Sequence, residues 1–495
     1  LIMIVVMLIT RFLLNTISLP ELLSDWFVSL TPTTLFTALL GSLGASAKII
    51  MFLLIIIGHV VCSVVLGICY TLVLEPVPFY KEPRWPRGVL FSIVLWILTT
   101  TLIVPLAGGG LLGNQMSTNQ IGFLVGILIP YLIYGLFLTS TYEDLGTQAA
   151  SPSYGPSRRY TIKWIGISVL VLSLGGYVAK LFAERGPSIT AGGISQGIMP
   201  AEITPNEDFY IVSKNIIDPE LSPFNWKLSI EGLVNRPYSL TYDELTALPW
   251  VEEFVTLECI SNPVGGNLIS NAKWRGVPLK TILERAELQP QTIDIVSFAG
   301  DGYSESIPAE LALQSQVMVA YRMNDDYLPI KHGFPARLVI PGLYGEKNTK
   351  WLTKIVAMGE DYLGFWQKLG WGDTAEVKTT SQIRVPKRNS KFPKQRITTG
   401  GIAFSGDKGI SRVDISSDGG KSWMLAKLSD PLSPYTWVLW TADWLPTQIG
   451  NIPLIVLATD GNEIRQLSEV RGSFPSGATG IHETRVIIDP ELNNK

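Results

Sequence analysis

The sequence predicts an N-terminal α-helical transmembrane bundle of four or five spans, followed by an α+β domain and a C-terminal immunoglobulin-like β-sandwich. Three observations predict this order. Residues 1–183 are rich in Leu, Ile, Val and Gly with few charges, residues 200–377 mix helix and strand patterns, and residues 397–495 contain short strands at regular spacing. The Gly- and Ser-rich stretch 184–199 and the basic stretch 378–396 are expected to be linkers.

Four hydrophobic runs are long enough to cross about 30 Å of hydrocarbon as helices. They cover residues 49–74, 88–106, 121–139 and 164–183. An earlier run, from Leu1 to about Leu19, carries Arg11 and Asn15. We expect this run to be a fifth span, the remnant of a truncated span or an interfacial helix.

Basic residues in the loops predict the orientation of the bundle. They fall in two loops: Lys81, Arg84 and Arg87 in one, and Arg158, Arg159 and Lys163 in the other. The loop 108–120 has no charge. Because Lys and Arg are retained on the cytoplasmic side, we expect a multi-pass cell-membrane protein, in contact with membrane lipid, whose part after Ala183 is extracytoplasmic.

The stretch 157–163, just before the fourth run, resembles a twin-arginine export signal. Such a signal implies a domain that folds, and commonly loads a cofactor, before export. The alternative is that Arg158 and Arg159 only fix the orientation of the span.

Composition excludes several classes of function. A net charge of −3 with mixed signs gives no basic footprint, so nucleic acid is not an expected partner. The soluble part has one cysteine, Cys259, and therefore no internal disulfide. Of three histidines only His59 lies in a hydrophobic run, which excludes a haem held by two histidines of this bundle.

The soluble part alternates strands and short helices. Strands are expected at 226–231, 253–258, 292–298, 317–322, 336–340 and 352–358, and helices at 241–247, 279–286 and 308–314. The first of these helices is expected to open with Thr241 as a cap ahead of Glu244. C-terminal strands are expected at 401–405, 410–416, 423–427, 436–442, 452–460 and 484–488. The turn 417–420 supplies glycines for a hairpin, and about 95 residues of this pattern favour an immunoglobulin-like sandwich.

Cys259 is the first candidate for chemistry. It closes the strand-like segment 254–259 and precedes a polar, Gly-containing turn at 260–266. A thiolate at a strand end beside a loop suits a soft metal or nucleophilic attack. Taken alone, a single cysteine is more often a buried core residue.

A second candidate is the pair of basic, Gly-rich loops at 331–337 and 341–351. They flank one predicted strand, so their cationic groups and backbone N–H groups could converge on a phosphate. A charged surface loop is the alternative.

Taken together, these motifs resemble the sulfite oxidase family of molybdopterin enzymes. The matching elements run in the family's order over about residues 200–490, namely Thr-Leu-Glu-Cys at 256–259, 303–308, Ala-Tyr-Arg-Met-Asn at 320–324, His-Gly-Phe-Pro-Ala-Arg at 332–337, Lys350-Trp351 and 411–416 with the Asp-Gly-Gly turn.

The resemblance implies a mononuclear molybdenum held by one pterin dithiolene, with Cys259 as the protein's thiolate ligand. It further implies that the pterin and its phosphate are bound by His332, Arg337, Lys347, Asn348, Thr349 and Lys350, with Asn215 near the first cofactor-contacting loop. The C-terminal sandwich resembles the family's dimerisation domain, so a homodimer through it is a possible assembly.

Departures from the family concern the substrate. Positions that carry pocket arginines in animal and plant sulfite oxidases align with Val264 and Ser213, and the pocket tyrosine aligns with Trp371. Arg471 alone matches a pocket arginine, although it could instead be a strand-end salt-bridge residue. With its positive charge reduced, the pocket should bind sulfite poorly, so a small substrate other than sulfite is expected. A sulfoxide-type compound is one candidate, and the direction of the reaction stays open.

The resulting hypothesis is a membrane-anchored enzyme that transfers oxygen atoms and electrons. Its electron partner is expected to be an external quinone or cytochrome, because the chain has no Cys-x-x-Cys-His site and no cysteine set for an iron–sulfur cluster. The alternative is a non-enzymatic, membrane-tethered scaffold that retains the fold. A transporter is less favoured, because the hydrophobic runs lack buried acidic residues.

Overall fold

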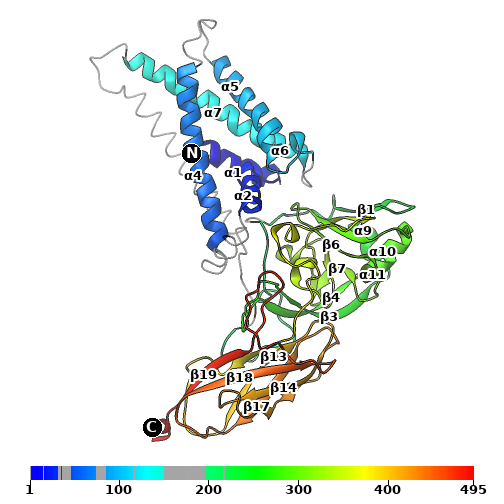
Figure 1. The fold of residues 1–495 in the computed structure, drawn as a ribbon. Coiled ribbons are helices and arrows are strands. Elements are labelled where there is room, and N and C mark those ends of the chain that lie inside the picture. The colour runs from blue at the N-terminus through cyan, green and yellow to red at the C-terminus, as the bar shows by residue number, and fades with distance from the viewer. Residues whose placement is uncertain are drawn as a thin grey trace. The chain divides into compact units, whose positions relative to one another are not determined.

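A computed structural model describes residues 2–14, 16–31, 35, 46–73, 85–114, 119–149, 176, 193, 195–215 and 218–494. The chain divides into two compact units (Figure 1). The N-terminal unit comprises Leu1–Ile189 and Ser213–Glu220, and the second comprises Thr190–Val212 and Leu221–Lys495. The short segment Ser213–Glu220 follows the hydrophobic region in the sequence but belongs to the N-terminal unit by its contacts.

The N-terminal unit is helical. Its described elements are α1 (Ile2–Leu14), α2 (Leu19–Leu30), α4 (Ser46–Val73), α5 (Trp85–Leu98), the π-helical η1 (Thr99–Ile103), α6 (Val104–Leu106), η2 (Leu111–Gly113) and α7 (Gln120–Ala149). Within the described residues, three stretches are long and apolar enough to cross a membrane: Ile50–Tyr70, Trp85–Leu106 and Gln120–Thr141.

These three stretches correspond to the first three predicted spans. The early run at 1–19 is a helix pair, α1 and α2, bent by 96°, and would add at most one more span. The predicted span 164–183, the basic pair Arg158-Arg159 and most of the linker 184–199 fall outside the described residues.

Polar residues of α1 and α2 are paired inside the N-terminal unit. Ser18 caps α2 in a capping box with Glu21, and Glu21 also forms a buried ion pair of 3.3 Å with Arg11. Asp25 of α2 pairs with Lys214 of the segment Ser213–Glu220 at 2.9 Å. The charge of Arg11, which complicated the prediction of a span, is therefore balanced within the helix pair.

The α+β region of the second unit contains two sheets. One has the order β2-β1-β10-β5-β6, and the other the order β3-β4-β7-β8 with β9 paired to β7. Their strands are β1 (Lys227–Gly232), β2 (Tyr238–Thr241), β3 (Val251–Glu258), β4 (Ile269–Pro278), β5 (Asp294–Ala299), β6 (Ser304–Pro308), β7 (Met318–Met323), β8 (Asp326–Tyr327), β9 (Arg337–Val339) and β10 (Leu352–Met358).

The helices of this region follow their sequence signals. The helix α9 (Tyr242–Ala247) begins with a capping box between Thr241 and Glu244, as predicted. The helix α10 (Leu279–Ala286) has the predicted bounds and buries its apolar face in the core, while α11 (Ala309–Ala312) is shorter than expected.

The C-terminal region is a sandwich of two sheets around one apolar core (Figure 1). The sheets have the orders β11-β13-β17-β16 and β12-β19-β18-β14-β15. Their strands are β11 (Thr380–Val385), β12 (Lys391–Phe392), β13 (Ile397–Phe404), β14 (Ile410–Ser416), β15 (Met424–Leu425), β16 (Lys427–Leu428), β17 (Val438–Trp444), β18 (Gly450–Asp460) and β19 (His482–Ile488).

One expectation differs here. The stretch 378–396, expected to be a linker, contains β11 and β12, so the sandwich begins near Thr380 rather than at 397. The basic composition concealed a strand in which Ile383 is buried in the sandwich core.

Candidate functional site

Cys259 lies where the sequence predicted, directly after β3. Residues 251–258 pair with β4 up to the partners Glu258 and Ile269, and the Cys259 N–H then donates to the Leu268 carbonyl at 3.0 Å. The thiol is buried and lies 3.0 Å from the Ser261 hydroxyl. Burial raises the pKa of the Cys259 thiol. A thiolate at this position therefore requires a compensating positive charge, such as a metal ion.

His332 and Arg337, on the loop predicted to bind the pterin, are buried together. The His332 Nε2–H donates to the Asn206 carbonyl at 3.0 Å, and burial lowers the pKa of the imidazole to about 3. The Arg337 guanidinium donates to the carbonyls of His332 at 3.0 Å and Asn348 at 3.1 Å. It also lies 5.0 Å from the ring centroid of Trp274. Arg337 thus ties the two basic loops together.

The predicted phosphate loop is ordered by its own hydrogen bonds. Asn348 accepts from the Ile340 N–H at 2.7 Å and donates to the Tyr344 carbonyl at 3.0 Å. The Thr349 hydroxyl lies 2.7 Å from that of Ser297, and Lys350 donates to the Lys331 carbonyl at 3.1 Å. His332, Arg337, Asn348, Thr349 and Lys350 are therefore brought into one neighbourhood.

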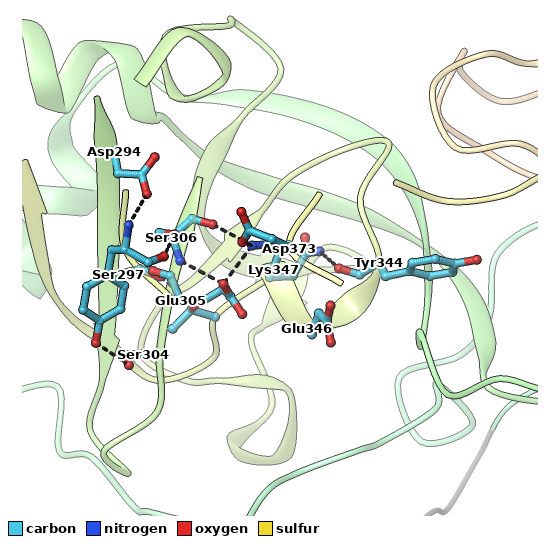
Figure 2. A network of polar contacts seen from close by, with 12 residues as sticks. Asp294, Ser297, Ser304, Glu305, Ser306, Tyr344, Glu346, Lys347 and Asp373 are labelled. Carbon is cyan, nitrogen blue, oxygen red and sulfur yellow. Dashed lines mark hydrogen bonds and ion pairs between the residues drawn. The ribbon is translucent and has the colours of Figure 1, made fainter. Parts of the chain in front are cut away.

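Lys347, in η4 (Gly345–Lys347), is directed into a buried network instead (Figure 2). Its ammonium group lies 2.9 Å from Glu305 Oε1, 3.1 Å from Asp373 Oδ1 and 3.1 Å from the Ser306 carbonyl. These three acceptors match the three N–H donors of an ammonium group. Although burial opposes it, the pKa of Lys347 is raised by Glu305 and Asp373.

Two carboxyl groups near Cys259 have buried oxygens without a hydrogen-bond partner among the described residues. They are Glu258, through Oε2, and Glu346, through both oxygens. Burial raises the pKa of Glu258 to about 7, and burial with the charge of Glu305 raises that of Glu346 to about 8. Both groups act electrostatically on the Cys259 thiol.

The remaining predicted residues lie in different places. Trp371 is buried in an apolar cluster with Ile260, and its ring N–H has no partner in the described part of the chain. The Arg471 side chain is 66% exposed and pairs with Glu469 at 2.7 Å. This agrees with the alternative that Arg471 is a salt-bridge residue rather than a pocket arginine. Asn215 belongs to the N-terminal unit and accepts from Lys214 at 2.8 Å.

A buried arginine that the sequence reasoning missed approaches the cysteine loop. Arg384 of β11 donates to the carbonyl of Gly266 and to the Gln382 side chain, and it faces the charge of Glu258. Its signal was the strand pattern at 380–385, which was hidden within the presumed linker. Ile383, the residue before Arg384, donates its N–H to His482 of β19 at 2.9 Å.

In the described part of the chain, few metal-binding side chains surround Cys259. Among the residues that the structure describes, no group of three or more His, Cys, Asp and Glu side chains could hold a metal ion. One buried thiol therefore fits a metal whose other ligands come from an organic cofactor. Buried polar atoms of Glu258, Glu346, Gln367 and Trp371, all in the second unit, have no hydrogen-bond partner among the described residues, as expected where a ligand completes the hydrogen bonding.

Comparisons with known proteins agree with this donor set. The oxidoreductase molybdopterin binding domain matches residues 215–366, and the Mo-co oxidoreductase dimerisation domain matches residues 373–463. The chain is 30% identical over 310 residues to sulfite oxidase of Gallus gallus, covering 52% of this chain and 67% of that protein. It is 34% identical over 289 residues to mitochondrial sulfite oxidase of Drosophila melanogaster, covering 48% of this chain and 50% of that protein.

A solved structure shares the fold. The sulfane dehydrogenase SoxCD of Paracoccus pantotrophus matches with a TM-score of 0.53 and 23% identity, over 59% of this chain and 84% of that chain. The fold and the domain matches define a molybdopterin-dependent oxidoreductase. More specifically, the chain belongs to the sulfite oxidase family, and its cofactor is molybdenum–molybdopterin. The chain spans about half the length of the Drosophila relative.

Proposed function

We propose that this protein is a membrane-anchored enzyme that transfers oxygen atoms to or from a small uncharged substrate of the sulfoxide type, outside the cytoplasm. Electrons would be exchanged with an external quinone or cytochrome. Bound molybdenum–molybdopterin supplies two-electron redox chemistry and oxygen transfer, while the protein supplies position and electrostatics.

One observation carries the substrate proposal: the charges around Cys259 do not favour a dianion. Two carboxyl groups, Glu258 and Glu346, act on the thiol. The described basic groups nearby have other partners, since Lys347 is held by Glu305 and Asp373 and Arg337 by backbone carbonyls. Neither carboxyl group attracts a dianion such as sulfite, whether it is protonated or ionised, whereas an uncharged oxo compound needs no positive charge for binding.

Roles for the individual residues follow from the resemblance and the geometry. Cys259 is proposed as the metal ligand, with Trp371 bordering the substrate. The pterin and its phosphate are proposed to be held by His332, Arg337, Asn348, Thr349 and Lys350. Asn215, Lys347 and Arg471 remain predicted site residues, although the Lys347 donors are directed to other acceptors and Arg471 is exposed.

The experiment is metal and pterin analysis of the detergent-purified chain, followed by turnover assays with sulfoxides, sulfite and nitrate. We expect about one molybdenum and one pterin per chain, and turnover with sulfoxides but not with sulfite. Cys259→Ser should lose turnover, whereas Cys69→Ser, in α4, serves as the matched control. Faster turnover with sulfite than with any sulfoxide would contradict the substrate proposal.

Membrane anchoring is supported by the three apolar helices and the distribution of basic residues in the loops. We propose that the bundle is multi-pass and that Arg158 and Arg159 belong to a twin-arginine signal. In spheroplasts, added protease should digest the part after residue 190. Replacing both arginines by lysine should leave that part protected inside the cell.

A homodimer through the C-terminal sandwich is proposed from the match to the dimerisation domain. An immunoglobulin-like topology is also proposed for this sandwich, supported by two packed sheets around a common core. Light scattering of the purified chain should give twice the mass of one chain after correction for detergent.

A further inference from the structure

Glu346 sits on a turn that packs against the end of the cysteine strand. A Cβ atom added at Gly345, the preceding residue, would lie 3.4 Å from the Glu258 carbonyl oxygen and 2.5 Å from the Tyr210 hydroxyl. The turn η4 is therefore in close contact with the residue that precedes Cys259. This contact places Glu346 near the proposed metal ligand, and ionisation of Glu346 would raise the pKa of the Cys259 thiol.

Both carboxyl oxygens of Glu346 are buried and have no hydrogen-bond partner among the described residues. Its neighbour Lys347 is a potential partner, but the three donors of that ammonium group are directed to Glu305, Ser306 and Asp373 (Figure 2). The nearby hydroxyl of Tyr303 donates at 2.7 Å to the backbone carbonyl of Glu346, not to its carboxyl. Nothing described thus stabilises a carboxylate at this position by a hydrogen bond.

Glu305, a second buried acid near Lys347, differs from Glu346 because its carboxyl group accepts hydrogen bonds. Its carboxyl accepts from Lys347 at 2.9 Å and from the Ser306 N–H at 3.0 Å, and it lies 3.2 Å from the Tyr303 hydroxyl. Lys347 thus donates hydrogen bonds to Glu305 and Asp373 but none to Glu346. The arrangement favours an ionised Glu305 beside a protonated Glu346, because like charges at one site disfavour a second ionisation.

We propose that Glu346 is the proton donor of the candidate site and supplies the proton that accompanies oxygen transfer. The ion pairs of Lys347 with Glu305 and Asp373 keep Glu346 protonated. The inference rests on the proposed function. Reduction of a sulfoxide breaks the S–O bond and consumes two electrons, from the external quinol or cytochrome, and two protons, giving a thioether and water. Glu346 supplies one of these protons and solvent the other.

The titratable groups around Glu346 are consistent with this role. They are Glu305, Asp373, Lys347, Cys259, Tyr303 and Tyr344. Burial and Glu305 raise the pKa of Glu346 to about 8, with Lys347 opposing them. An acid with a pKa near the operating pH is best suited to exchange protons.

The test uses the detergent-purified full chain with its cofactor, in wild type, Glu346→Gln, Asp373→Asn and Glu310→Gln. Glu310 is exposed on α11 and is the matched control. Molybdenum content is measured for every variant, so that lost turnover can be separated from lost cofactor. The pH dependence of kcat with a sulfoxide and the infrared band of protonated carboxyl groups are the two readouts.

For Glu346→Gln we expect full molybdenum content, a fall in kcat of about 100-fold at pH 7 and loss of the decline above pH 8. Wild type should show a carboxyl infrared band that disappears as the pH rises through about 8, and this band should be absent from the variant. In Asp373→Asn the band should disappear at lower pH, because the negative charge of Asp373, which raises the pKa of Glu346, is removed. Glu310→Gln should match wild type.

An unchanged kcat and pH profile in Glu346→Gln would overturn the inference, as would a wild type without the band. Absence of any sulfoxide turnover in wild type would instead contradict the proposed function. The infrared readout needs no substrate, so it then still decides whether Glu346 carries the proton.

Discussion

Lys347 is the residue on which the buried network depends. Its side chain and that of Glu305 are 3% and 1% exposed and lie 2.9 Å apart. Removing one partner of a buried pair leaves an uncompensated charge, which costs about 3–5 kcal/mol. We therefore expect Lys347→Met to lower the free energy of unfolding of the second unit by this amount, measured by urea unfolding of the full chain in detergent.

The matched variant is the double replacement Lys347→Met with Glu305→Gln. Since both charges are then absent, it should recover much of the loss. A double variant no more stable than Lys347→Met would show that the pair does not determine the effect.

His482 is expected to make the sandwich sensitive to acid. Burial, assisted by the charges of Arg384 and Arg388, lowers the pKa of His482 to about 4. The unfolded chain, with an ordinary pKa of about 6.5, then binds more protons than the folded one. The contribution of His482 to the free energy of unfolding is therefore fully present above pH 6.5 and is lost as the pH falls towards 4.

The amide oxygen of glutamine can still accept from the Ile383 N–H, so His482→Gln should flatten this dependence. The measurement is the thermal midpoint of wild type and variant between pH 4 and pH 8. Equal slopes for the two proteins would exclude His482 as the origin.

At the scale of elements, α5 and α7 approach closely through two glycines. A Cβ atom at Gly135 would collide with the Gly88 carbonyl, and the Ser92 hydroxyl donates to the Tyr131 carbonyl at 2.7 Å in the same contact. Small residues allow this approach between apolar helices. We expect Gly135→Val to destabilise the helical unit by about 1–3 kcal/mol, as overpacking does.

Gly58 of α4 offers the control for this change, because a Cβ atom there would meet no atom within 4 Å. Gly58→Val should leave the thermal midpoint of the detergent-solubilised protein unchanged. Equal losses from both valines would point to helix propensity rather than to packing.

The elements also show what the sequence could predict. Capping by Thr241 and Glu244 and the bounds of α10 depend on local signals, and both were predicted correctly. Cys259 was placed at a strand end because alternation and a following turn are local as well. By contrast, β11 was missed, since its pairing with β13 depends on residues distant in the sequence and its basic composition resembled a linker.

The sequence could indicate which residue types form the candidate site, but not which hydrogen-bond and ion-pair partners they have. The candidate residues between His332 and Lys350 were proposed from their motif, and the structure brings five of them together. The sequence could not show that Lys347 is held by Glu305 and Asp373, because these residues lie 42 and 26 positions away. Glu346 was missed for the same reason: its importance comes from hydrogen bonds that its neighbours form elsewhere.

At the scale of the whole molecule, the division into two units predicts which functions can be separated. The second unit contains the apolar cores of the α+β region and of the sandwich, together with Cys259 and the two basic loops at 331–337 and 341–351. A chain beginning at residue 190 should therefore fold and retain molybdenum. It should turn over a sulfoxide with a soluble artificial reductant such as a viologen.

Electron delivery from a membrane quinol should be lost in the same fragment, because the apolar helices that would bring the enzyme to the quinol are missing. The segment Ser213–Glu220 also loses Asp25, the partner of Lys214, so a modest fall in viologen-driven turnover is expected as well. Full-length protein and a fragment carrying Cys259→Ser are the controls. Quinol-driven turnover in the fragment equal to that of the full chain would show that the helical unit has no part in electron delivery, and would leave it the role of an anchor alone.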